Sequence, residues 1–267
     1  MREELHKYTM ITGATGVLGG AFVRAALQNG ERLILTGRSE EKLRMLKERL
    51  LTEKPDADIK IYAADLSNEG SRGAMTEKIS AEGLLIGRLI NVAGADVQKG
   101  VKDYTEEKLV FQCRVNFEAA ASLCRFAYER RAKGLEIINI SSVSGIYPMP
   151  YFALYSATKG ALTSFSVAFR EEVRREGVKV TAVLPGAIPT REDIKAQIKG
   201  QGLWGRLAAK SPEFVVKKSL KALAKNRAKL IPGFWNKVMN ATTKFVPAGL
   251  RTRFIAKRWS KISKDAF

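Results

Sequence analysis

The sequence predicts an α/β fold, a single domain built on a doubly wound parallel sheet with a basic C-terminal extension. Three observations in the 267 residues lead to this prediction. Short apolar segments alternate with amphipathic segments, a glycine-rich turn follows the first apolar segment, and positive charge is concentrated toward the C-terminus. Short strands that are apolar on both faces and alternate with helices are typical of a parallel sheet covered by helices on both sides.

The elements follow from this alternation. The expected strands are Tyr8–Ile11, Leu33–Thr36, Ile59–Ala63, Leu89–Asn91, Glu136–Ile140, Val178–Leu184 and finally Lys229–Ile231. The expected helices are Leu18–Asn29, Glu40–Leu51, Ser71–Glu82, Glu106–Arg131 and Tyr151–Glu176. A later helix is expected to begin at Ser211, because serine caps helix N-termini and Pro212 suits the first turn. The chain has no obvious linker, so we expect one catalytic domain over residues 1–233 and an extension over residues 234–267.

The first apolar segment runs directly into a glycine-rich turn, Thr12-Gly13-Ala14-Thr15-Gly16-Val17-Leu18-Gly19. Glycines in such a turn let the backbone approach a pyrophosphate, and the N-terminus of the following helix attracts its charge. An ordinary glycine-rich turn is the alternative, but the expected strand before it and helix after it favour a dinucleotide site. The residues expected to contact the dinucleotide here are Gly13, Thr15, Gly16, Leu18 and Gly19.

The end of the second expected strand indicates which dinucleotide is bound. An acidic residue at this point would accept hydrogen bonds from an unphosphorylated ribose, whereas this chain has Gly37 followed by Arg38. A guanidinium suits a 2′-phosphate. The sequence therefore favours NADP(H) over NAD(H) as the cofactor, with Arg38 on a solvated loop as the alternative.

Five further motifs occur in order on the expected elements. They are Asn91-Val92-Ala93-Gly94, Asn116, Ser141-Ser142-Val143-Ser144-Gly145, Tyr155-Ser156-Ala157-Thr158-Lys159 and Pro185-Gly186-Ala187-Ile188-Pro189-Thr190. Together with the glycine-rich turn, they resemble the successive motifs of the short-chain dehydrogenase/reductase family, over about residues 8–190. The resemblance implies a Rossmann-type fold and carbonyl–alcohol interconversion. Further cofactor contacts are then expected at Asp65, Leu66, Asn91, Ala93, Gly94, Pro185, Gly186, Ile188 and Thr190.

The expected chemistry centres on Tyr155 and Lys159. These residues are four apart on one helix, so their side chains share a face. A phenol has an ordinary pKa of about 10, and a nearby ammonium stabilises the phenolate, so Lys159 is expected to lower the pKa of Tyr155. Tyr155 can then exchange a proton with the substrate oxygen. Ser142 can hold that oxygen, and the resemblance implies that Lys159 also holds the nicotinamide ribose and that Asn116 keeps a water that relays protons to Lys159.

Two departures from the family pattern keep alternatives open. Gly16 lies one position earlier than the middle glycine of the shorter, single-domain branch, and this spacing is that of the longer, epimerase-like branch. The chain is too short for that branch's substrate domain, and Asn91-Val92-Ala93-Gly94 fits the shorter one. Val92 stands where asparagine is more usual. A non-catalytic cofactor-binding or membrane-surface module of the same fold is the second alternative, but such a module should have lost Tyr155 or Lys159.

Residues 187–210 are expected to cover the substrate. The apolar residues in this stretch are Ile194, Ile198, Leu203, Trp204 and Leu207. They favour a small hydrophobic ketone, aldehyde or alcohol as the substrate. The alternative is that these side chains only pack residues 187–210, the expected lid, against the domain. We also expect a homo-oligomer, either a dimer or a tetramer.

Composition excludes several classes of protein. No segment approaches the roughly 20 apolar residues that cross a bilayer, and the charges at Met1–Lys7 do not suit a signal peptide, so a cytoplasmic protein is expected. His6 is the only histidine. Cys113 and Cys124 lie about 16 Å apart along one expected helix, too far for a disulfide. With neither histidine nor cysteine clusters, no metal site is expected.

The net charge of +19 is unevenly distributed. Residues 195–267 contain eighteen lysines and arginines against two acids, Glu213 and Asp265. Aromatic residues are interleaved with this charge at Phe234, Trp235, Phe245, Phe254 and Trp259. Three interpretations stay open: peripheral contact with an anionic membrane surface, packing on the chain's own domain or a second subunit, and contact with nucleic acid, which is the least favoured.

Overall fold

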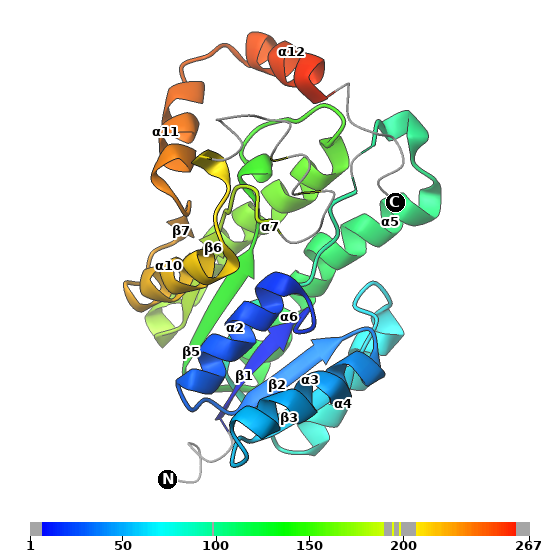
Figure 1. Ribbon diagram of the computed structural model, residues 1–267, viewed down its shortest axis with the longest axis vertical. Helices are drawn as coiled ribbons and strands as arrows, with labels where there is room; N and C mark the ends of the chain where they lie inside the picture. The colour runs from blue at the N-terminus through cyan, green and yellow to red at the C-terminus, as the bar shows by residue number, and fades with distance from the viewer. Residues whose placement is uncertain (1–6, 98, 190–193, 195–197, 199–206, 260–267) are drawn as a thin grey trace.

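The computed structural model describes residues 7–97, 99–189, 194, 198 and 207–259, which form a parallel sheet between two layers of helices (Figure 1). The strands are β1 (Lys7–Thr12), β2 (Leu33–Gly37), β3 (Ile59–Ala63), β4 (Leu85–Asn91), β5 (Arg131–Ile140), β6 (Lys179–Val183) and β7 (Lys229–Leu230). Their order in the sheet is β3-β2-β1-β4-β5-β6-β7, and every pair is parallel. The predicted doubly wound sheet in a single domain is confirmed.

Helices join the strands. They are α2 (Val17–Gln28), α3 (Glu40–Glu53), α4 (Glu69–Ala81), α5 (Glu106–Cys113), α6 (Ala119–Glu129), α7 (Ala153–Glu172), α10 (Pro212–Ala224), α11 (Phe234–Thr243) and α12 (Ala248–Trp259). Short helical turns occur at Val101–Asp103, Val143–Gly145 and Arg174–Glu176, and a π-helical turn, η2, spans Arg114–Glu118. Ser211 caps α10 by accepting a hydrogen bond from the Phe214 backbone N–H, as its sequence predicts.

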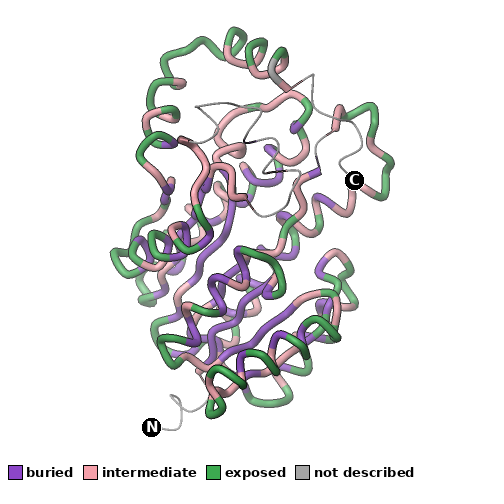
Figure 2. The backbone as a smooth tube through the Cα atoms, in the orientation of Figure 1, coloured by how far each residue is buried: buried purple, intermediate pink, exposed green. Residues whose placement is uncertain are grey.

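Two apolar clusters fix the layers on the sheet. On one face, side chains of α2, α3 and α10, among them Phe22, Leu43 and Val215, pack on the strands. On the other face, α4 and α6 contribute side chains such as Ile79 and Leu123. Figure 2 shows the buried backbone concentrated along the strands. Burial of both faces accounts for the continuous apolar runs in the strand sequences.

The order of the strands creates the crevice in which a ligand can bind. The chain leaves β1 toward β2 and β3 on one side, and then crosses back to place β4 beside β1 on the other. The chain reverses direction across the sheet between β1 and β4. The loops that follow these two strands therefore run in opposite directions, which opens a crevice at the carboxyl ends of the strands. The residues after β1 and β4 are therefore the first candidates for ligand contact.

One predicted helix is interrupted in the structure, and two strands start several residues earlier than expected. Strand β4 starts at Leu85 instead of Leu89. The predicted helix Glu106–Arg131 consists of α5, the π turn η2 and α6, and β5 already starts at Arg131 instead of Glu136. The pairing of β5 with β4 shifts register between Ile86 and Arg88, and Gly134 has a φ of +75°. The early part of β5 is largely polar and exposed. This irregular, solvated pairing lacks the apolar run by which the strand could be recognised.

The C-terminal extension folds back over the domain as two helices. In Figure 1, α11 and α12 (orange and red) arch over the half of the molecule toward which the strands point. Asn236 of α11 is buried and donates hydrogen bonds to the backbone oxygens of Ala208 and Pro232. We call α11, α12 and their connection, residues 234–259, the C-terminal arm. Within the described residues, the structure contains no helix with the length and apolar character needed to span a bilayer.

Candidate active site

The turn after β1 brings the backbone unusually close to neighbouring segments. Gly13 has a φ of +63°, and a side chain there would approach the Ala93 backbone to 3.1 Å. A side chain at Gly19 would clash with the carbonyl oxygen of Gly13. Thr15 and Gly16 are exposed at the start of α2. This tight, open turn at a helix N-terminus is a cradle that fits a dinucleotide pyrophosphate.

A side chain of β1 ties this turn to the segment after β4. The Thr12 hydroxyl accepts hydrogen bonds from the backbone N–H groups of Val92 and Ala93, each at 3.0 Å. The next residue, Gly94, is close to the catalytic group expected from the sequence. A Cβ there would lie 3.0 Å from Asn116 Oδ1 and 3.1 Å from Lys159 Nζ. The glycine turn and the Lys159 side chain therefore meet across the ends of β1 and β4.

One pocket of about 1230 Å³ contains most of the residues singled out in the sequence. Those that line it are Gly13, Thr15, Gly16, Leu18, Gly19, Arg38, Asp65, Leu66, Ala93, Gly94, Ser142, Tyr155, Lys159, Pro185, Gly186 and Ile188. Its volume is above the roughly 300–1,000 Å³ of an ordinary small-molecule site, so it can hold a dinucleotide together with a substrate. Thr190 and two expected lid residues, Leu203 and Trp204, lie outside the described residues.

Two expected site residues are not among those that line the pocket. Asn91 is buried beneath it, and its Nδ2 donates to Asn139 Oδ1 at 2.9 Å. Asn116 lies in the π turn, where Oδ1 accepts from the Ala95 N–H at 2.7 Å and Nδ2 donates to the Ala95 carbonyl at 2.8 Å. Nδ2 is also 3.2 Å from Thr158 Oγ1. In the described structure, Asn116 thus fixes the backbone after β4.

Ser142 is placed by close packing of the segment after β5 on α7. The Ser141 hydroxyl donates to the Lys159 carbonyl oxygen at 2.7 Å. A side chain at Gly145 would lie only 2.6 Å from the backbone N of Gly160. Ser142 Oγ accepts a hydrogen bond from the Ser144 N–H at 3.1 Å. This leaves the hydroxyl proton of Ser142 available to donate.

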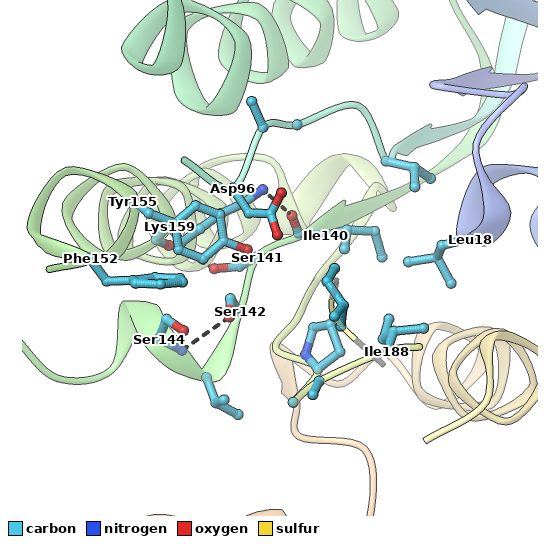
Figure 3. A pocket seen from close by; sticks show the side chains of 18 of the residues that line it. Leu18, Asp96, Ile140, Ser141, Ser142, Ser144, Phe152, Tyr155, Lys159 and Ile188 are labelled. Atoms are coloured by element: carbon cyan, nitrogen blue, oxygen red, sulfur yellow. Dashed lines mark hydrogen bonds between the residues drawn. The ribbon is translucent and has the colours of Figure 1, made fainter. Parts of the chain in front are cut away.

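Tyr155 and Lys159 lie together on one face of α7, as their spacing predicts. Lys159 Nζ is 5.9 Å from the centroid of the Tyr155 ring and donates to the Ile140 carbonyl oxygen at 3.0 Å. Figure 3 shows Tyr155, Lys159 and Ser142 gathered on one side of the pocket, with Leu18 and Ile188 across it. The catalytic side chains and the dinucleotide turn thus face the same space.

The electrostatics differ from the expectation that Lys159 lowers the phenol pKa. Burial raises the pKa of Tyr155 above its ordinary value, the Asp96 carboxylate raises it further, and a hydrogen bond with Ser142 opposes both. Burial lowers the pKa of Lys159 to about 8, and Asp96 opposes that change. In the protein alone, Tyr155 is therefore protonated at neutral pH. It is in the form that gives up a proton.

Sequence reasoning missed several residues of the pocket. Asp96 follows the Asn91–Gly94 motif by two positions and lies beside Tyr155 and Lys159 (Figure 3). The Phe152 ring contacts both Tyr155, with centroids 5.4 Å apart, and Trp259 of α12, 5.0 Å apart. Arg251, also on α12, lines the pocket. An acid just after a glycine motif was a visible signal for Asp96, but nothing local in the sequence indicated that the C-terminal arm returns to the site.

A dinucleotide-type glycine turn and a Ser–Tyr–Lys group in one pocket define a nucleotide-dependent oxidoreductase of the α/β class. The family model for short chain dehydrogenases matches residues 7–199, and the chain belongs to this family. It is therefore an oxidoreductase of a family that uses nicotinamide cofactors. The match to this model over a single domain favours the shorter branch of the family over the epimerase-like branch that the spacing of Gly16 had left open.

Known relatives cover most of the chain. A very-long-chain 3-oxoacyl-CoA reductase from Bos taurus is 31% identical over 82% of this chain and 69% of its own length. An uncharacterized oxidoreductase from Staphylococcus epidermidis is 28% identical over 71% of this chain and 81% of its own. Among solved structures, a 7beta-hydroxysteroid dehydrogenase has a TM-score of 0.82 and 26% identity, with 96% of this chain and 98% of that chain covered.

Proposed function

We propose that this protein is an NADP(H)-dependent oxidoreductase that interconverts a hydrophobic carbonyl compound and its alcohol. The observation that carries the proposal is that Ser142, Tyr155 and Lys159 line the same pocket as the glycine-rich turn. Each of these side chains has the chemistry that carbonyl reduction requires, as follows.

When bound, the dinucleotide supplies the hydride that reduces the carbonyl carbon. The Ser142 hydroxyl donates a hydrogen bond to the carbonyl oxygen, because its own oxygen already accepts from the Ser144 N–H. Tyr155 gives its proton to that oxygen as negative charge develops on it, and the raised pKa keeps the proton available at neutral pH. The Lys159 ammonium stabilises the resulting phenolate. In the reverse direction, Tyr155 accepts the proton of the alcohol.

The choice of NADP(H) is supported by Arg38. This residue follows β2, is exposed, and lines the pocket at the end that holds the glycine-rich turn. No acidic residue occupies the end of β2. An exposed guanidinium can pair with a 2′-phosphate, and its charge gives no advantage to an unphosphorylated ribose.

The hydrophobic nature of the substrate is supported by the lining on the C-terminal side of the pocket. Its apolar members include Ile146, Met149, Phe152, Phe254, Ile255 and Trp259. Two relatives, a very-long-chain 3-oxoacyl-CoA reductase and a 7beta-hydroxysteroid dehydrogenase, are named for compounds with large apolar parts. Both facts favour a large carbonyl compound over a small sugar or hydroxy acid.

We further propose a cytoplasmic homo-oligomer that attaches peripherally to anionic membrane surfaces through the C-terminal arm. The arm contains no acidic residue. Its exposed apolar residues Phe245 and Leu250 lie near Lys244 and Arg253, which are also exposed. Apolar side chains among lysines and arginines suit the interface of an anionic bilayer.

A screen for NADPH consumption over ketones and aldehydes of graded chain length tests the proposed reaction. We expect turnover of long apolar substrates to exceed that of short ones, and NADPH to be used in preference to NADH. Absence of any carbonyl-dependent oxidation of either cofactor, in a preparation that melts cooperatively, would contradict the assignment.

A further inference from the structure

The substrate side of the pocket carries an unusual cation at its C-terminal wall. Arg251 lines the pocket from α12, and its Nη1 donates to the Thr243 carbonyl oxygen at 3.0 Å. The guanidinium carbon lies 4.5 Å from the centroid of the Tyr147 ring. The Arg251 Nε atom is buried and has no hydrogen-bond partner within the described part of the chain. No carboxylate lies within ion-pair distance of Arg251 among those same residues.

A cation in this position is held ready for an anion. A partly buried charge is costly unless it is paired and its N–H groups are satisfied. Here a backbone carbonyl and an aromatic face hold the guanidinium, and neither neutralises it. A guanidinium with free N–H groups fits a carboxylate or phosphate in two-point contact. The backbone carbonyl and the aromatic ring orient the guanidinium, and an anionic ligand would neutralise its charge.

The first helix of the arm, α11, is attached to the domain without Arg251. Tyr147 already donates to the backbone oxygen of Asn240 at 2.8 Å, and Thr243 donates to the Tyr147 hydroxyl at 2.5 Å. Asn236 secures the start of α11 through the Ala208 carbonyl at 3.0 Å. These bonds fix the platform on which the guanidinium rests. A preorganised cation loses less entropy when it binds a ligand.

Apolar side chains lie between Arg251 and the reacting centre. It precedes Trp259 by eight residues on α12, about 12 Å along a helix axis. The Trp259 ring contacts Phe152, which contacts Tyr155. The wall between these points is apolar, with Phe254 and Ile255 of α12 and Met149 opposite among the lining residues. A substrate that contacts both Tyr155 and Arg251 along this wall would therefore have an apolar segment between the two contacts.

The catalytic end of the pocket contains an acidic side chain beside Lys159. Asp96 lines it beside Tyr155 and Lys159 (Figure 3). Its backbone is fixed on both sides, because Asn116 holds Ala95 and the Tyr104 hydroxyl donates to the Val97 carbonyl oxygen at 3.0 Å. A substrate whose carboxylate is next to its carbonyl would place that carboxylate beside both Asp96 and Lys159, away from Arg251. An acidic group can therefore use Arg251 only when it lies at a distance from the reacting carbonyl.

We propose that Arg251 binds an acidic group of the substrate, and that the substrate is an amphipathic carbonyl compound in which an apolar segment separates the reacting carbonyl from that group. This inference rests on the proposed carbonyl reduction. It adds the chemical class of the substrate, an apolar ketone or aldehyde with a distant carboxylate or phosphate.

The inference can be tested with keto-carboxylic acids of graded length, each of which has its ketone near the end remote from the carboxylate. Each acid is compared as a substrate with its own methyl ester. Steady-state kinetics with NADPH would be measured for the wild type, Arg251→Gln, Arg251→Lys and Arg253→Gln. Arg253 is the control because it is exposed on the same helix and does not line the pocket. Each acid is compared with its ester, so a general distortion of the pocket would affect both members of a pair alike.

The wild type should prefer a long keto acid to its ester, and it should lose this preference when the ketone is next to the carboxylate. In Arg251→Gln, KM for the long acid should rise at least about tenfold, as expected for a lost charge-assisted contact, while KM for the ester changes little. Arg251→Lys should be intermediate, and Arg253→Gln should resemble the wild type. Equal changes for acid and ester in Arg251→Gln, or no preference for the acid in the wild type, would overturn the inference. Failure of both compounds to support NADPH oxidation in the wild type would instead contradict the proposed reaction.

Discussion

At the scale of single residues, burial and two neighbouring charged groups set the chemistry of the pocket. Tyr155 is half-buried and Lys159 is buried, which favours the neutral form of each. Asp96 favours the protonated form of both side chains. It therefore opposes the pKa shift that burial causes at Lys159 and adds to the pKa shift that burial causes at Tyr155. The result is a phenol that keeps its proton and an amine with a pKa of about 8. The protein alone is thus arranged for proton donation, the step that completes carbonyl reduction.

The depressed pKa of Lys159 predicts a dependence of stability on pH. The folded value is about 8 and the ordinary value 10.5, so between these pH values the unfolded chain binds more protons. Lys159 should therefore contribute stability that rises from about pH 8 to 10.5, measured as the difference between the wild type and a variant without this lysine. Lys159→Met should remove this rise and increase the free energy of unfolding at pH 7 by up to about 3 kcal/mol, although it abolishes activity and loses the bond to Ile140. Urea unfolding at several pH values measures this. An identical pH slope in the variant and the wild type would contradict it, with Lys42→Met on the exposed face of α3 as the control.

Arg38 predicts the preference between the two cofactors. Arg38→Asp replaces a side chain that can bind a phosphate with one that can bind ribose hydroxyls. The ratio of kcat/KM for NADPH to kcat/KM for NADH should therefore fall by at least about tenfold. The comparison is Arg49→Asp, which introduces the same charge change at an exposed position of α3 outside the pocket. If both variants alter the ratio equally, the effect is one of net charge and Arg38 has no specific role.

The sequence was informative about residues whose chemistry depends on local spacing. Tyr155 and Lys159 are four residues apart on one helix, and Ser142 follows a strand, so their convergence could be predicted. Asp96 and Arg251 could not be assigned in the same way. The charge environment of the phenol depends on burial and on Asp96, which spacing does not reveal. The position of Arg251 depends on how a distant helix returns to the site.

At the scale of elements, the contact between the segment after β5 and α7 aligns the catalytic group. Gly145 allows the two backbones to touch, since any side chain would lie 2.6 Å from Gly160 N and from the carbonyl carbon of Lys159. This contact determines where Ser142 lies relative to Tyr155. A displacement of about 1 Å at a reacting centre can lower the rate about a hundredfold.

Gly145→Ala should therefore lower kcat by at least about tenfold, because the segment after β5 must move away from α7. Gly73→Ala is the matched control, since a Cβ there meets nothing within 4 Å and the residue lies within α4. The control should keep its activity and gain a little stability, as expected for alanine in a helix. Full activity in Gly145→Ala with an unchanged melting temperature would show that the close contact does not position Ser142.

The prediction of elements succeeded where an apolar period was continuous and failed where a polar interaction interrupted it. Helix α3 could be recognised from its capping Ser39, the acids of its first turn and its buried Leu43 and Leu46. The π turn at Arg114–Glu118 could not, because an extra residue in one turn leaves the helical pattern on either side intact. That turn places Asn116 where it hydrogen-bonds with Ala95. The irregularity therefore has a structural role that the spacing of apolar residues does not reveal.

At the scale of the whole molecule, the sheet was predictable and the path of the C-terminal arm was not. Alternating strands and helices leave few arrangements other than a doubly wound sheet, whose crevice at β1 and β4 then follows. The arm contains helices that are partly buried and partly exposed, and its charge gave no indication of which domain surface it would cover. Its helices α11 and α12 both line the pocket and present exposed apolar side chains to solvent.

The exposed side of the arm predicts binding to anionic vesicles. Phe245 is 88% exposed and Leu250 60%, and neither lines the pocket. The double variant Phe245→Ser, Leu250→Ser should pellet less with vesicles that contain an anionic lipid, and Met45→Ser on α3 should behave as the wild type. Binding of the wild type should weaken with salt and be absent on neutral vesicles. Equal pelleting of all three proteins would leave the arm as a cover of the pocket or a contact between subunits.

The central claim is that one pocket joins an NADP(H) site to a proton-donating Tyr155. Its most direct test is the single-turnover oxidation of bound NADPH by a long-chain ketone in the wild type and in Tyr155→Phe, with NADPH affinity measured in parallel. The account predicts NADPH affinity within about twofold of the wild type and a rate at least about a hundredfold lower, because only the proton donor is removed. An undiminished rate in Tyr155→Phe would contradict the account.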